Sequence, residues 1–314
     1  PRGVGRADRG MRKSVQSIWD QVQSTLFDTA HDFEPMPLLS INADAHKFMR
    51  GHALVLSGGP GRTGAARLAA RGALRVGAGL VPLGVPPAAQ MEVACQVTAI
   101  MLARVPDAEA LAAMLEDTRL NALCLGPGLG LSDPRRALVL AALEGKRRAV
   151  LDADALTVFQ DDPETLFAKL HRDCVLTPHA GEFARLFPDL AQVWRDTDVI
   201  GEAGSKVSAV QAAAKRAGCT VLLKGADTVV ADPDGQTRVV AAVYTRAAPM
   251  LATAGSGDVL AGFITGLMAQ GLGPLAAASR AAWLHQECGR AFGPGLIAED
   301  LPEVLPRVLA AELG

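Results

Sequence analysis

Short apolar runs that end in glycines or acids alternate along this chain with segments of helical periodicity. The runs at residues 53–59, 122–130, 148–156 and 174–182 lack the alternation of apolar and polar residues that is typical of a strand with one solvent-exposed face. Strands of this kind lie in a mostly parallel sheet that is covered by helices on both faces. Ligands of such sheets bind outside the carboxyl ends of the strands. The loops after these runs therefore predict one shared site, in an α/β enzyme or ligand-binding protein.

The remaining segments continue the alternation. Further strands are expected at residues 80–85, 98–102 and 220–225, and a hairpin around a D-P-D-G turn at 229–241. Helices are expected at residues 63–76, 107–120, 133–145, 205–217 and 255–271. Another is expected after the turn that ends the run at 174–182, and two more before the C-terminus.

Composition excludes several classes of protein. Among 314 residues the net charge is −2, and aromatic residues make up 4%, which argues against a nucleic-acid or acidic-membrane binder. No run of about 20 apolar residues is present to span a membrane. The five cysteines are widely spaced and form no C-x-x-C pair, which argues against a disulfide framework or a zinc site. A reducing compartment, the cytoplasm, is expected.

Residues 1–45 differ from the body of the chain, which we assign to residues 46–314. Trp19 lies in a weakly amphipathic run, and a proline-containing linker follows it. We interpret residues 1–45 as an N-terminal arm or leader that docks on the body or on a neighbour, with a floppy tail as the alternative. The basic first residues are not followed by the apolar stretch of a secretory signal.

A Gly-Ser-Gly-Asp sequence at the start of an expected helix is the strongest local motif. Gly255, Ser256 and Gly257 allow backbone N–H groups to converge, and the helix that begins near Asp258 adds its positive end. This arrangement predicts an anion hole suited to phosphate. The helix dipole is expected to keep Asp258 ionised, as a base toward a hydroxyl that attacks phosphorus. An ordinary aspartate at a helix start is the alternative.

The segment LATAGSGDVLAG at residues 251–262 resembles the signature of the ribokinase-like superfamily. More narrowly, it is similar to that of the ADP/ATP-dependent NAD(P)H-hydrate dehydratases. Five other segments match that family in the same order, from about residue 46 to residue 271 and more loosely beyond. They are SGGPGRTGAARLAARGALRVGAGLV (57–81), LGPGLG (125–130), LDADAL (151–156), LTPHAGEFARL (176–186) and LLKGADTVVADPDG (222–235). The resemblance implies a ribokinase-like three-layer sandwich.

The family repairs NADHX and NADPHX, the hydrated forms of the reduced nicotinamide cofactors. The resemblance implies that ADP, or ATP, phosphorylates the ring hydroxyl in the presence of Mg²⁺, and that phosphate is then eliminated. A bacterial-looking sequence favours ADP. Asp258 would be the base, and Gly255, Ser256 and Gly257 would stabilise the transferring phosphoryl group.

The resemblance also implies two sets of binding residues. The adenine nucleotide would contact Lys224, Gly225, Ala226, Asp227, Thr228 and Gly257. The hydrated dinucleotide would contact Ala65, Gly128, Gly130, His179 and Asp258. Without the family, these positions have plainer interpretations: a polar turn after a strand, a histidine that caps a helix, and glycines that allow tight packing.

The metal ligands stay open. Asp152 and Asp154 can hold a water-coordinated Mg²⁺ or cap the following helix, and Glu182 can orient His179 or organise Mg²⁺ through water. Residues 57–65 match neither the dinucleotide fingerprint nor a P-loop, and we interpret them as a substrate loop.

Residues 243–250 lack the Asn-x-x-Gly-Asn-type stretch of many family members, which puts substrate detail in question. A fused epimerase domain is not expected. A homo-oligomer is expected, namely a tetramer as in many family members. Two other functions stay open, namely a ribokinase-like kinase of a small alcohol or vitamin precursor and a non-catalytic nucleotide-binding protein.

Overall fold

A single mixed sheet organises the computed structural model, which describes residues 46–196, 205–242 and 246–312. Within these residues nine strands lie in the order β3-β2-β1-β4-β5-β6-β7-β8-β9. The pairs from β3 through β7 are parallel, and β8 and β9 add an antiparallel hairpin at one edge. The strands are β1 (Ala53–Leu56), β2 (Leu83–Val85), β3 (Leu102–Arg104), β4 (Ala122–Leu125), β5 (Arg148–Leu151), β6 (Cys174–Leu176), β7 (Thr220–Leu223), β8 (Asp227–Ala231) and β9 (Thr237–Ala241).

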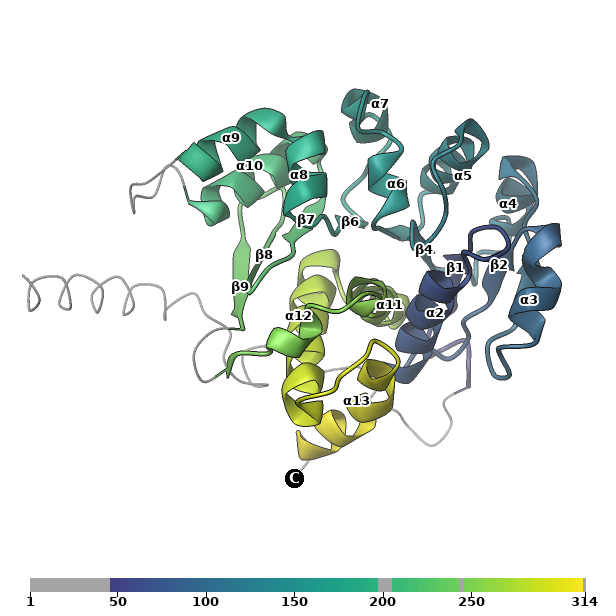
Figure 1. Cartoon of the computed structure of the whole chain (residues 1–314). Helices are drawn as coiled ribbons and strands as arrows, with labels where there is room; N and C mark the ends of the chain where they lie inside the picture. Colours follow the sequence, from purple (N-terminus) through teal and green to yellow (C-terminus); the bar gives the residue numbers. More distant parts are fainter. Residues whose placement is uncertain (1–45, 197–204, 243–245, 313–314) are drawn as a thin grey trace, which may run out of the picture.

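Helices cover both faces of this sheet (Figure 1). On one face lie α4 (Ala108–Met114), α5 (Asp133–Glu144), α6 (Asp154–Thr157), α7 (Pro163–Phe167), α8 (Ala180–Leu186), α9 (Pro188–Asp196) and α10 (Lys206–Ala217). On the other lie α2 (Gly64–Arg75), α11 (Ser256–Ala269), α12 (Pro274–Phe292) and α13 (Asp300–Ala311), while α3 (Gln90–Ala94) lies near the β2–β3 edge.

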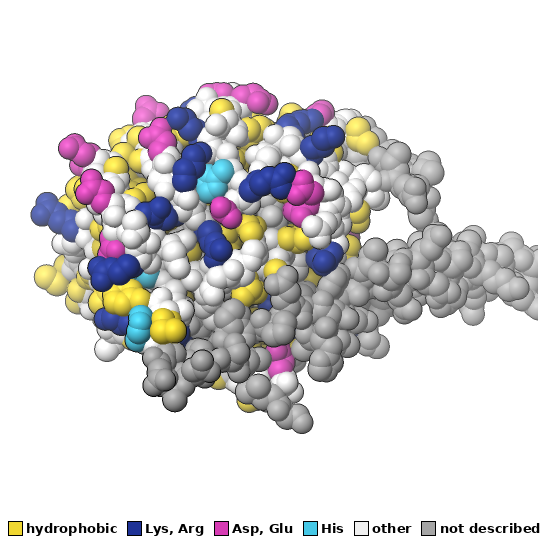
Figure 2. Space-filling view, turned by 180° about the vertical axis from the view of Figure 1, so that it is seen from behind, with side chains coloured by type: hydrophobic (Ala, Val, Ile, Leu, Met, Phe, Trp, Pro, Cys, Tyr) yellow, Lys and Arg dark blue, Asp and Glu magenta, His cyan; other side chains and the backbone are white. Residues whose placement is uncertain are grey.

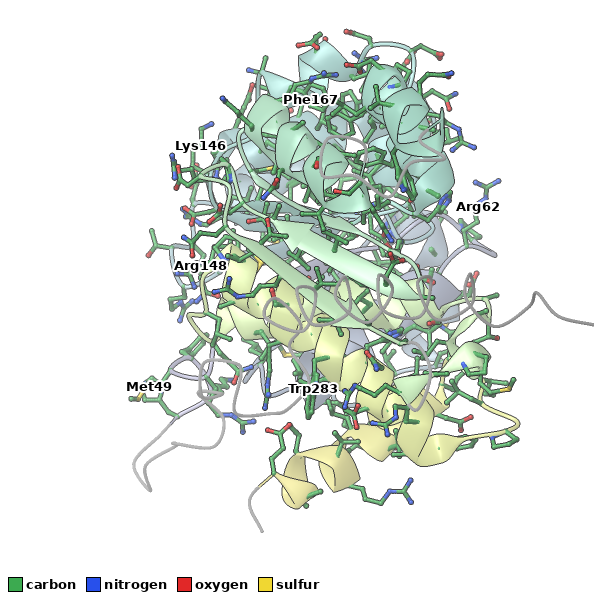
Figure 3. All side chains as sticks on the ribbon, turned by 90° about the vertical axis from the view of Figure 1, so that its left-hand side faces the viewer. Met49, Arg62, Lys146, Arg148, Phe167 and Trp283 are labelled. Carbon is green, nitrogen blue, oxygen red and sulfur yellow. The ribbon has the colours of Figure 1, made fainter. Side chains whose placement is uncertain are left out.

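Two buried clusters of apolar side chains fill the spaces between the layers. Figure 3 shows Phe167 above the sheet and Trp283 below it. The predicted three-layer α/β sandwich with a mostly parallel sheet is therefore confirmed.

Helices α2 and α11 pack with their backbones almost in contact. A β-carbon at Gly262 would lie 2.1 Å from the Ala69 carbonyl oxygen, and one at Gly266 would lie 2.5 Å from that of Ala73. Glycine at both positions permits this approach, which sets the N-terminal ends of the two helices side by side. Both ends belong to the candidate site.

Several predicted boundaries were wrong. The expected strand at residues 98–102 is a bend for most of its length, and β3 begins only at Leu102, where the chain reaches Leu83 of β2. The expected helix at 107–120 ends at Met114, since the Asp117 carboxylate accepts hydrogen bonds from the backbone and side chain of Arg119 and holds a turn. The short helices α3, α6, α7 and α9 were not predicted, and α6 begins within the run expected as a strand at residues 148–156.

No helix in the described part of the chain is long and apolar enough to cross a membrane. On the face drawn in Figure 2, Lys and Arg side chains are interspersed with Asp and Glu. The proposed arm at residues 1–45, with Trp19, lies outside the described residues, as do residues 243–245 of the altered stretch.

Candidate functional site

The carboxyl ends of β4, β5, β6 and β7 meet along one edge of the sheet. These strands are parallel neighbours, so the segments that follow them lie in a row. Asp152 follows β5, His179 follows β6 and Lys224 follows β7. Across from them begins α11, with Asp258 in its first turn. The structure therefore brings most of the predicted site residues together.

The residues Gly255–Asp258, which we call the anion loop, are held between two elements. Gly255 has φ +86°, and a β-carbon there would lie 2.7 Å from Leu68 Cδ1 on α2. A β-carbon at Gly257 would lie 3.3 Å from Lys224 Nζ, after β7. The first N–H groups of a helix lack intrahelical partners, so this loop can present donors to an anion.

Asp258 is half-buried in this loop, and its environment disfavours the charged form. Burial raises the pKa of Asp258 to about 7, and the charge of Asp152 adds to the effect, while Lys224 opposes it. Asp154 and Glu182 also raise this pKa. Burial and neighbouring carboxylates therefore oppose the helix dipole, which was expected to keep Asp258 ionised. A carboxyl with a pKa near 7 is suited to general-base catalysis.

Asp152 and Lys224 form a mostly buried ion pair at the base of the site. Asp152, which is 1% exposed, accepts hydrogen bonds through Oδ1 from Lys224 Nζ at 2.7 Å and from Thr177 Oγ1 at 2.8 Å. Burial alone would lower the pKa of Lys224, but Asp152, with Glu182 and Asp258, raises it overall. Lys224 is thus a fixed cation beside the anion loop.

A strained residue separates the two aspartates after β5. Ala153 has φ +48°, a conformation that costs a residue with a side chain roughly 1–3 kcal/mol. The turn lets Asp154 Oδ2 accept a hydrogen bond from the Gly130 N–H at 2.8 Å. Gly126 crosses beneath, where a β-carbon would lie 1.6 Å from the Asp152 carbonyl oxygen. The loops after β4 and β5 are therefore joined through their backbones.

The loop after β1 packs closely against the loop after β4. A β-carbon at Gly58 would lie 1.9 Å from the Gly128 carbonyl oxygen, and one at Gly128 would lie 2.5 Å from that of Arg62. The second of these hypothetical carbons would also lie 3.6 Å from Ala65 Cβ, so two predicted substrate residues are neighbours. Tight packing, the plainer interpretation of Gly128, is thus observed, and its contact with substrate remains a prediction.

His179 caps α8. Its Nδ1 accepts hydrogen bonds from the Gly181 N–H at 2.9 Å and the Glu182 N–H at 3.3 Å, and Glu182 Oε2 accepts one from the His179 N–H at 2.9 Å. The plainer interpretation of His179, a histidine that caps a helix, is therefore observed. The imidazole is also 54% exposed, and its Nε2 lies 3.4 Å from Glu182 Oε1, so a substrate that contacts Nε2 would lie next to this carboxylate.

The predicted nucleotide segment is the turn from β7 into β8. Thr228 Oγ1 donates to the Gly225 carbonyl at 3.1 Å, and Asp227 Oδ1 lies 3.0 Å from Lys206 Nζ. Lys206 is nearly buried at the start of α10, and a β-carbon at Gly225 would lie 2.7 Å from its Nζ. Sequence reasoning missed Lys206, since a lysine at a helix start has no distinguishing pattern.

Sequence reasoning also missed His285, a buried histidine of α12. Its Nε2 lies 2.9 Å from the Ser256 carbonyl oxygen and 3.0 Å from Ser256 Oγ. Burial lowers the pKa of His285 to about 4, so the ring is neutral at physiological pH and anchors the first turn of α11.

Replacing His285 tests whether this anchor positions the anion loop. We expect His285→Ala to lower kcat by about tenfold, because the loss of a buried hydrogen bond costs about 1–3 kcal/mol, and to change KM little. His285→Gln, which retains a donor, should recover part of the loss. Steady-state kinetics on both variants is the measurement, and an unchanged kcat in the folded alanine variant would contradict the role.

Known proteins of similar sequence and structure indicate the family and the fold of this chain. Residues 53–307 match the model of a family described as NAD(P)H-hydrate dehydratase. The chain is 40% identical to the bifunctional NAD(P)H-hydrate repair enzyme of Moorella thermoacetica, over 85% of this chain and 51% of that protein. It is 32% identical to an ADP-dependent (S)-NAD(P)H-hydrate dehydratase of Xanthomonas campestris, over 90% of this chain and 95% of that protein. The chain thus spans about half the length of its bifunctional relatives.

Solved structures agree. An ADP/ATP-dependent NAD(P)H-hydrate dehydratase from Bacillus subtilis, co-crystallised with ATP and Mg²⁺, superposes with a TM-score of 0.71 at 26% identity, over 91% of this chain and 98% of that one. A ribokinase-like superfamily protein from Enterococcus faecalis gives 0.71 at 20% identity, over 86% and 90% of the two chains. The predicted ribokinase-like fold is confirmed.

Proposed function

The chain belongs to the NAD(P)H-hydrate dehydratase family, and we propose that it uses ADP, or ATP, to convert (S)-NADHX and NADPHX back to NADH and NADPH. The observation that carries this proposal is the position of Asp258, a half-buried carboxyl in the first turn of α11, directly after Gly257 and near the Lys224 ammonium. Burial raises the pKa of this carboxyl to about 7. We infer that the hydroxyl and the phosphoryl group meet beside it. A general base beside an anion hole is what phosphoryl transfer to a weakly acidic hydroxyl requires.

Asp258 accepts the proton of the ring hydroxyl while that oxygen bonds to the terminal phosphorus of the nucleotide. The bond from this phosphorus to the bridging oxygen breaks, and AMP leaves when ADP is the donor. The ring nitrogen's lone pair then assists cleavage of the carbon–oxygen bond, phosphate departs, and loss of a proton from the adjacent ring carbon restores the dihydronicotinamide. Gly255, Ser256 and Gly257 stabilise charge on the transferring group through their N–H groups.

The two ligands approach the anion loop from opposite sides. The nucleotide lies against Gly257 and the turn that holds Lys224, Gly225, Ala226, Asp227 and Thr228. The hydrated dinucleotide lies toward Ala65, Gly128, Gly130 and His179. Support comes from the neighbours of the loop, which are Lys224 at Gly257 and Leu68 of α2 at Gly255. Lys224 supplies the fixed positive charge that a nucleotide phosphate requires.

Mg²⁺ fits this site only as an ion that keeps water ligands. Among the described residues, no three His, Cys, Asp or Glu side chains are grouped so that they can hold a metal ion directly. Mg²⁺ usually retains several waters and binds through one or two carboxylates and substrate phosphates, and it neutralises phosphate charge. Asp152, Asp154 and Glu182 are the carboxylates that would hold it through water, since in each of them one oxygen accepts the side-chain or backbone hydrogen bonds described above.

The proposal predicts a pH profile. Asp258 must be deprotonated to act as a base, so log kcat/KM should rise with a slope of 1 below about pH 7 and level off above it. Stopped-flow or steady-state rates between pH 5 and 9 would measure it. A rate that stays constant down to pH 5 would contradict the assignment of Asp258.

Incubation of the protein with NADHX or NADPHX, Mg²⁺ and either ADP or ATP tests the function. The absorbance of reduced nicotinamide should return with at least one nucleotide. Consumption of nucleotide with a small alcohol, and none with either hydrate, would instead support a ribokinase-like kinase.

We also propose that the protein is cytoplasmic and that it forms a homo-oligomer, which the family resemblance indicates is a tetramer. Light scattering on the full chain would test the tetramer. The same measurement on a chain without residues 1–45 would test whether the arm contributes to contacts between subunits. A monomeric mass for the full chain would contradict the tetramer.

A further inference from the structure

Lys206 is a charged side chain in a costly position. It is the first residue of α10, where the helix dipole disfavours a cation, and the first turn of this helix holds no acid to offset the charge. Lys206 is also only 9% exposed, and burial lowers its pKa, while the charge of Asp227 opposes this effect. A buried cation at a helix start does not stabilise the helix, so the contacts of Lys206 indicate its role.

The ammonium of Lys206 binds the turn Lys224–Thr228, which we call the nucleotide turn. It donates a hydrogen bond to the Asp227 carbonyl oxygen and lies 3.0 Å from Asp227 Oδ1. A β-carbon at Gly225 would lie 2.7 Å from Lys206 Nζ and 3.4 Å from Asp227 Oδ1, so glycine permits the turn to pack against this ion pair. One lysine thus fixes both the backbone and the side chain of Asp227.

Backbone hydrogen bonds hold the earlier part of the nucleotide turn. The Lys224 N–H donates to the Pro178 carbonyl at 2.9 Å, and the Ala242 N–H donates to the Ala226 carbonyl. The side chain of the next residue, Asp227, is 57% exposed, and Lys206 holds it. Without Lys206 this carboxylate would be free to turn into solvent.

Lys206 and Lys224 contact different parts of the candidate site. Lys224 lies near Gly257 of the anion loop, whereas Lys206 is paired with Asp227. Among the described residues, the charges that shift the pKa of Asp258 include that of Lys224 and not that of Lys206. Lys206 therefore acts on the nucleotide turn and not on the reacting groups.

We propose that Lys206 is a positioning residue for the adenine nucleotide, which it serves by holding Asp227 and with it the shape of the nucleotide turn. The inference rests on the proposed function, because it takes the nucleotide turn as the site of ADP or ATP. Since Lys206 acts through Asp227, its loss should weaken the binding of both nucleotides and leave the chemical step unchanged.

The variant Lys206→Met removes the ammonium and retains an unbranched side chain. The Kd for ADP and for ATP, measured by calorimetry, should rise about tenfold, because a charge-assisted hydrogen bond to the nucleotide turn is lost. At saturating nucleotide, kcat, the KM for NADHX and the acid limb of the pH profile near pH 7 should equal those of the wild type. Lys169→Met, which removes an exposed lysine paired with Glu144, is the matched control and should change none of these values.

Thermal unfolding separates positioning from a general loss of structure. Replacement of a buried charge by an apolar side chain of similar volume is often neutral or stabilising, so Tm of Lys206→Met should not fall. The substitution should also raise the nucleotide Kd less in an Asp227→Ala background, because part of the same contact is already lost. Fully additive effects, or equal losses of nucleotide and NADHX affinity, would overturn the inference.

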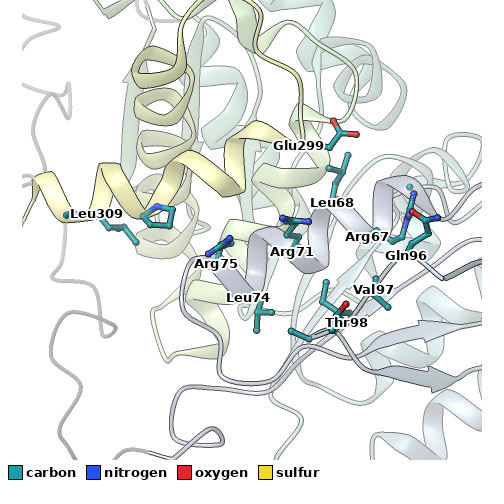
Figure 4. A pocket seen from close by; sticks show the side chains of 15 residues that line it. Arg67, Leu68, Arg71, Leu74, Arg75, Gln96, Val97, Thr98, Glu299 and Leu309 are labelled. Carbon is teal, nitrogen blue, oxygen red and sulfur yellow. The ribbon is translucent and has the colours of Figure 1, made fainter. Parts of the chain in front are cut away.

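A cavity of about 1030 Å³ between α2, residues 96–100 and α13 offers another place for an anionic nucleotide (Figure 4). Arg67, Arg71 and Arg75 line it, whereas none of residues 224–228 does. Ala99→Trp, at an exposed position of this lining, should leave the Kd for ADP unchanged. Weaker ADP binding in Ala99→Trp and unchanged binding in Lys206→Met would overturn the inference and assign the nucleotide to the cavity.

The proposed function and the role of Lys206 fail in different ways. If the wild type binds ADP but turns over neither hydrate, the proposed function fails, and the Kd values still decide on Lys206. An unchanged nucleotide Kd in the folded Lys206→Met variant, or a lower kcat with an unchanged Kd, would overturn the role of Lys206 alone. No binding of ADP or ATP to the wild type would overturn both.

Discussion

Asp258→Asn is expected to lower kcat by at least about 10²–10⁴-fold, the range that a positioned general base contributes, while the nucleotide still binds. Asparagine has nearly the shape of aspartate, so the anion loop and the turn that holds Lys224 should stay intact. Nucleotide affinity by calorimetry and turnover of NADHX measure the two effects. Asp133→Asn, an exposed aspartate in the first turn of α5, is the matched control and should retain full activity. Turnover near that of the wild type in Asp258→Asn would refute the assigned base.

The same substitution should stabilise the protein at neutral and alkaline pH. The folded-state pKa of Asp258 is raised from 3.8 to about 7, so its contribution to stability is fully present below pH 3.8 and is lost as the pH rises through 7. Asparagine stays neutral as the pH rises, so the variant does not have the free-energy cost of a buried charge. We therefore expect Tm of Asp258→Asn to exceed that of the wild type at pH 8, and the difference to shrink toward pH 4. A variant that is less stable at pH 8 would show that burial of the carboxylate is not costly.

Lys224→Met is expected to have the second largest effect. It leaves Asp152 buried without its cation, and loss of one partner from a buried pair costs roughly 3 kcal/mol. It also removes a positive charge that lowers the pKa of Asp258. The nucleotide KM should rise at least about tenfold, Tm should fall by several degrees, and the acid limb of the pH profile should move to higher pH.

The double variant Asp152→Asn/Lys224→Met separates stability from catalysis. Removal of both charges should restore much of the lost Tm, because no buried charge is left unpaired. Nucleotide affinity should remain low, because the cation is still absent. A double variant that binds nucleotide like the wild type would contradict the role of Lys224.

Much of the fold could be predicted from the pattern of apolar runs. The strands at residues 122–125, 148–151 and 220–223 lie within predicted runs because nearly all of their side chains are buried on both faces, which favours apolar residues. The strand at 102–104 could not be placed, since its start is set by pairing with β2 rather than by its own residues. Helix α7 carried a readable signal, because Asp162 caps it and Pro163 follows.

The candidate site was predictable where loops carry local motifs and not where distant segments meet. Gly255, Gly257 and Asp258 were identified from the motif at the start of α11. The pKa of Asp258 was not, because it depends on burial and on Asp152, which is distant in the sequence. His285 could not be found either, since its partner Ser256 lies across two packed helices.

Isotope labelling tests the central claim most directly. NADHX that carries ¹⁸O in the ring hydroxyl is incubated with the protein, Mg²⁺ and ADP, and the inorganic phosphate is analysed by mass spectrometry. Because the proposed route bonds that oxygen to phosphorus before the carbon–oxygen bond breaks, one ¹⁸O should appear in each phosphate released. Reduced cofactor formed with unlabelled phosphate, and ¹⁸O recovered in water, would contradict the account.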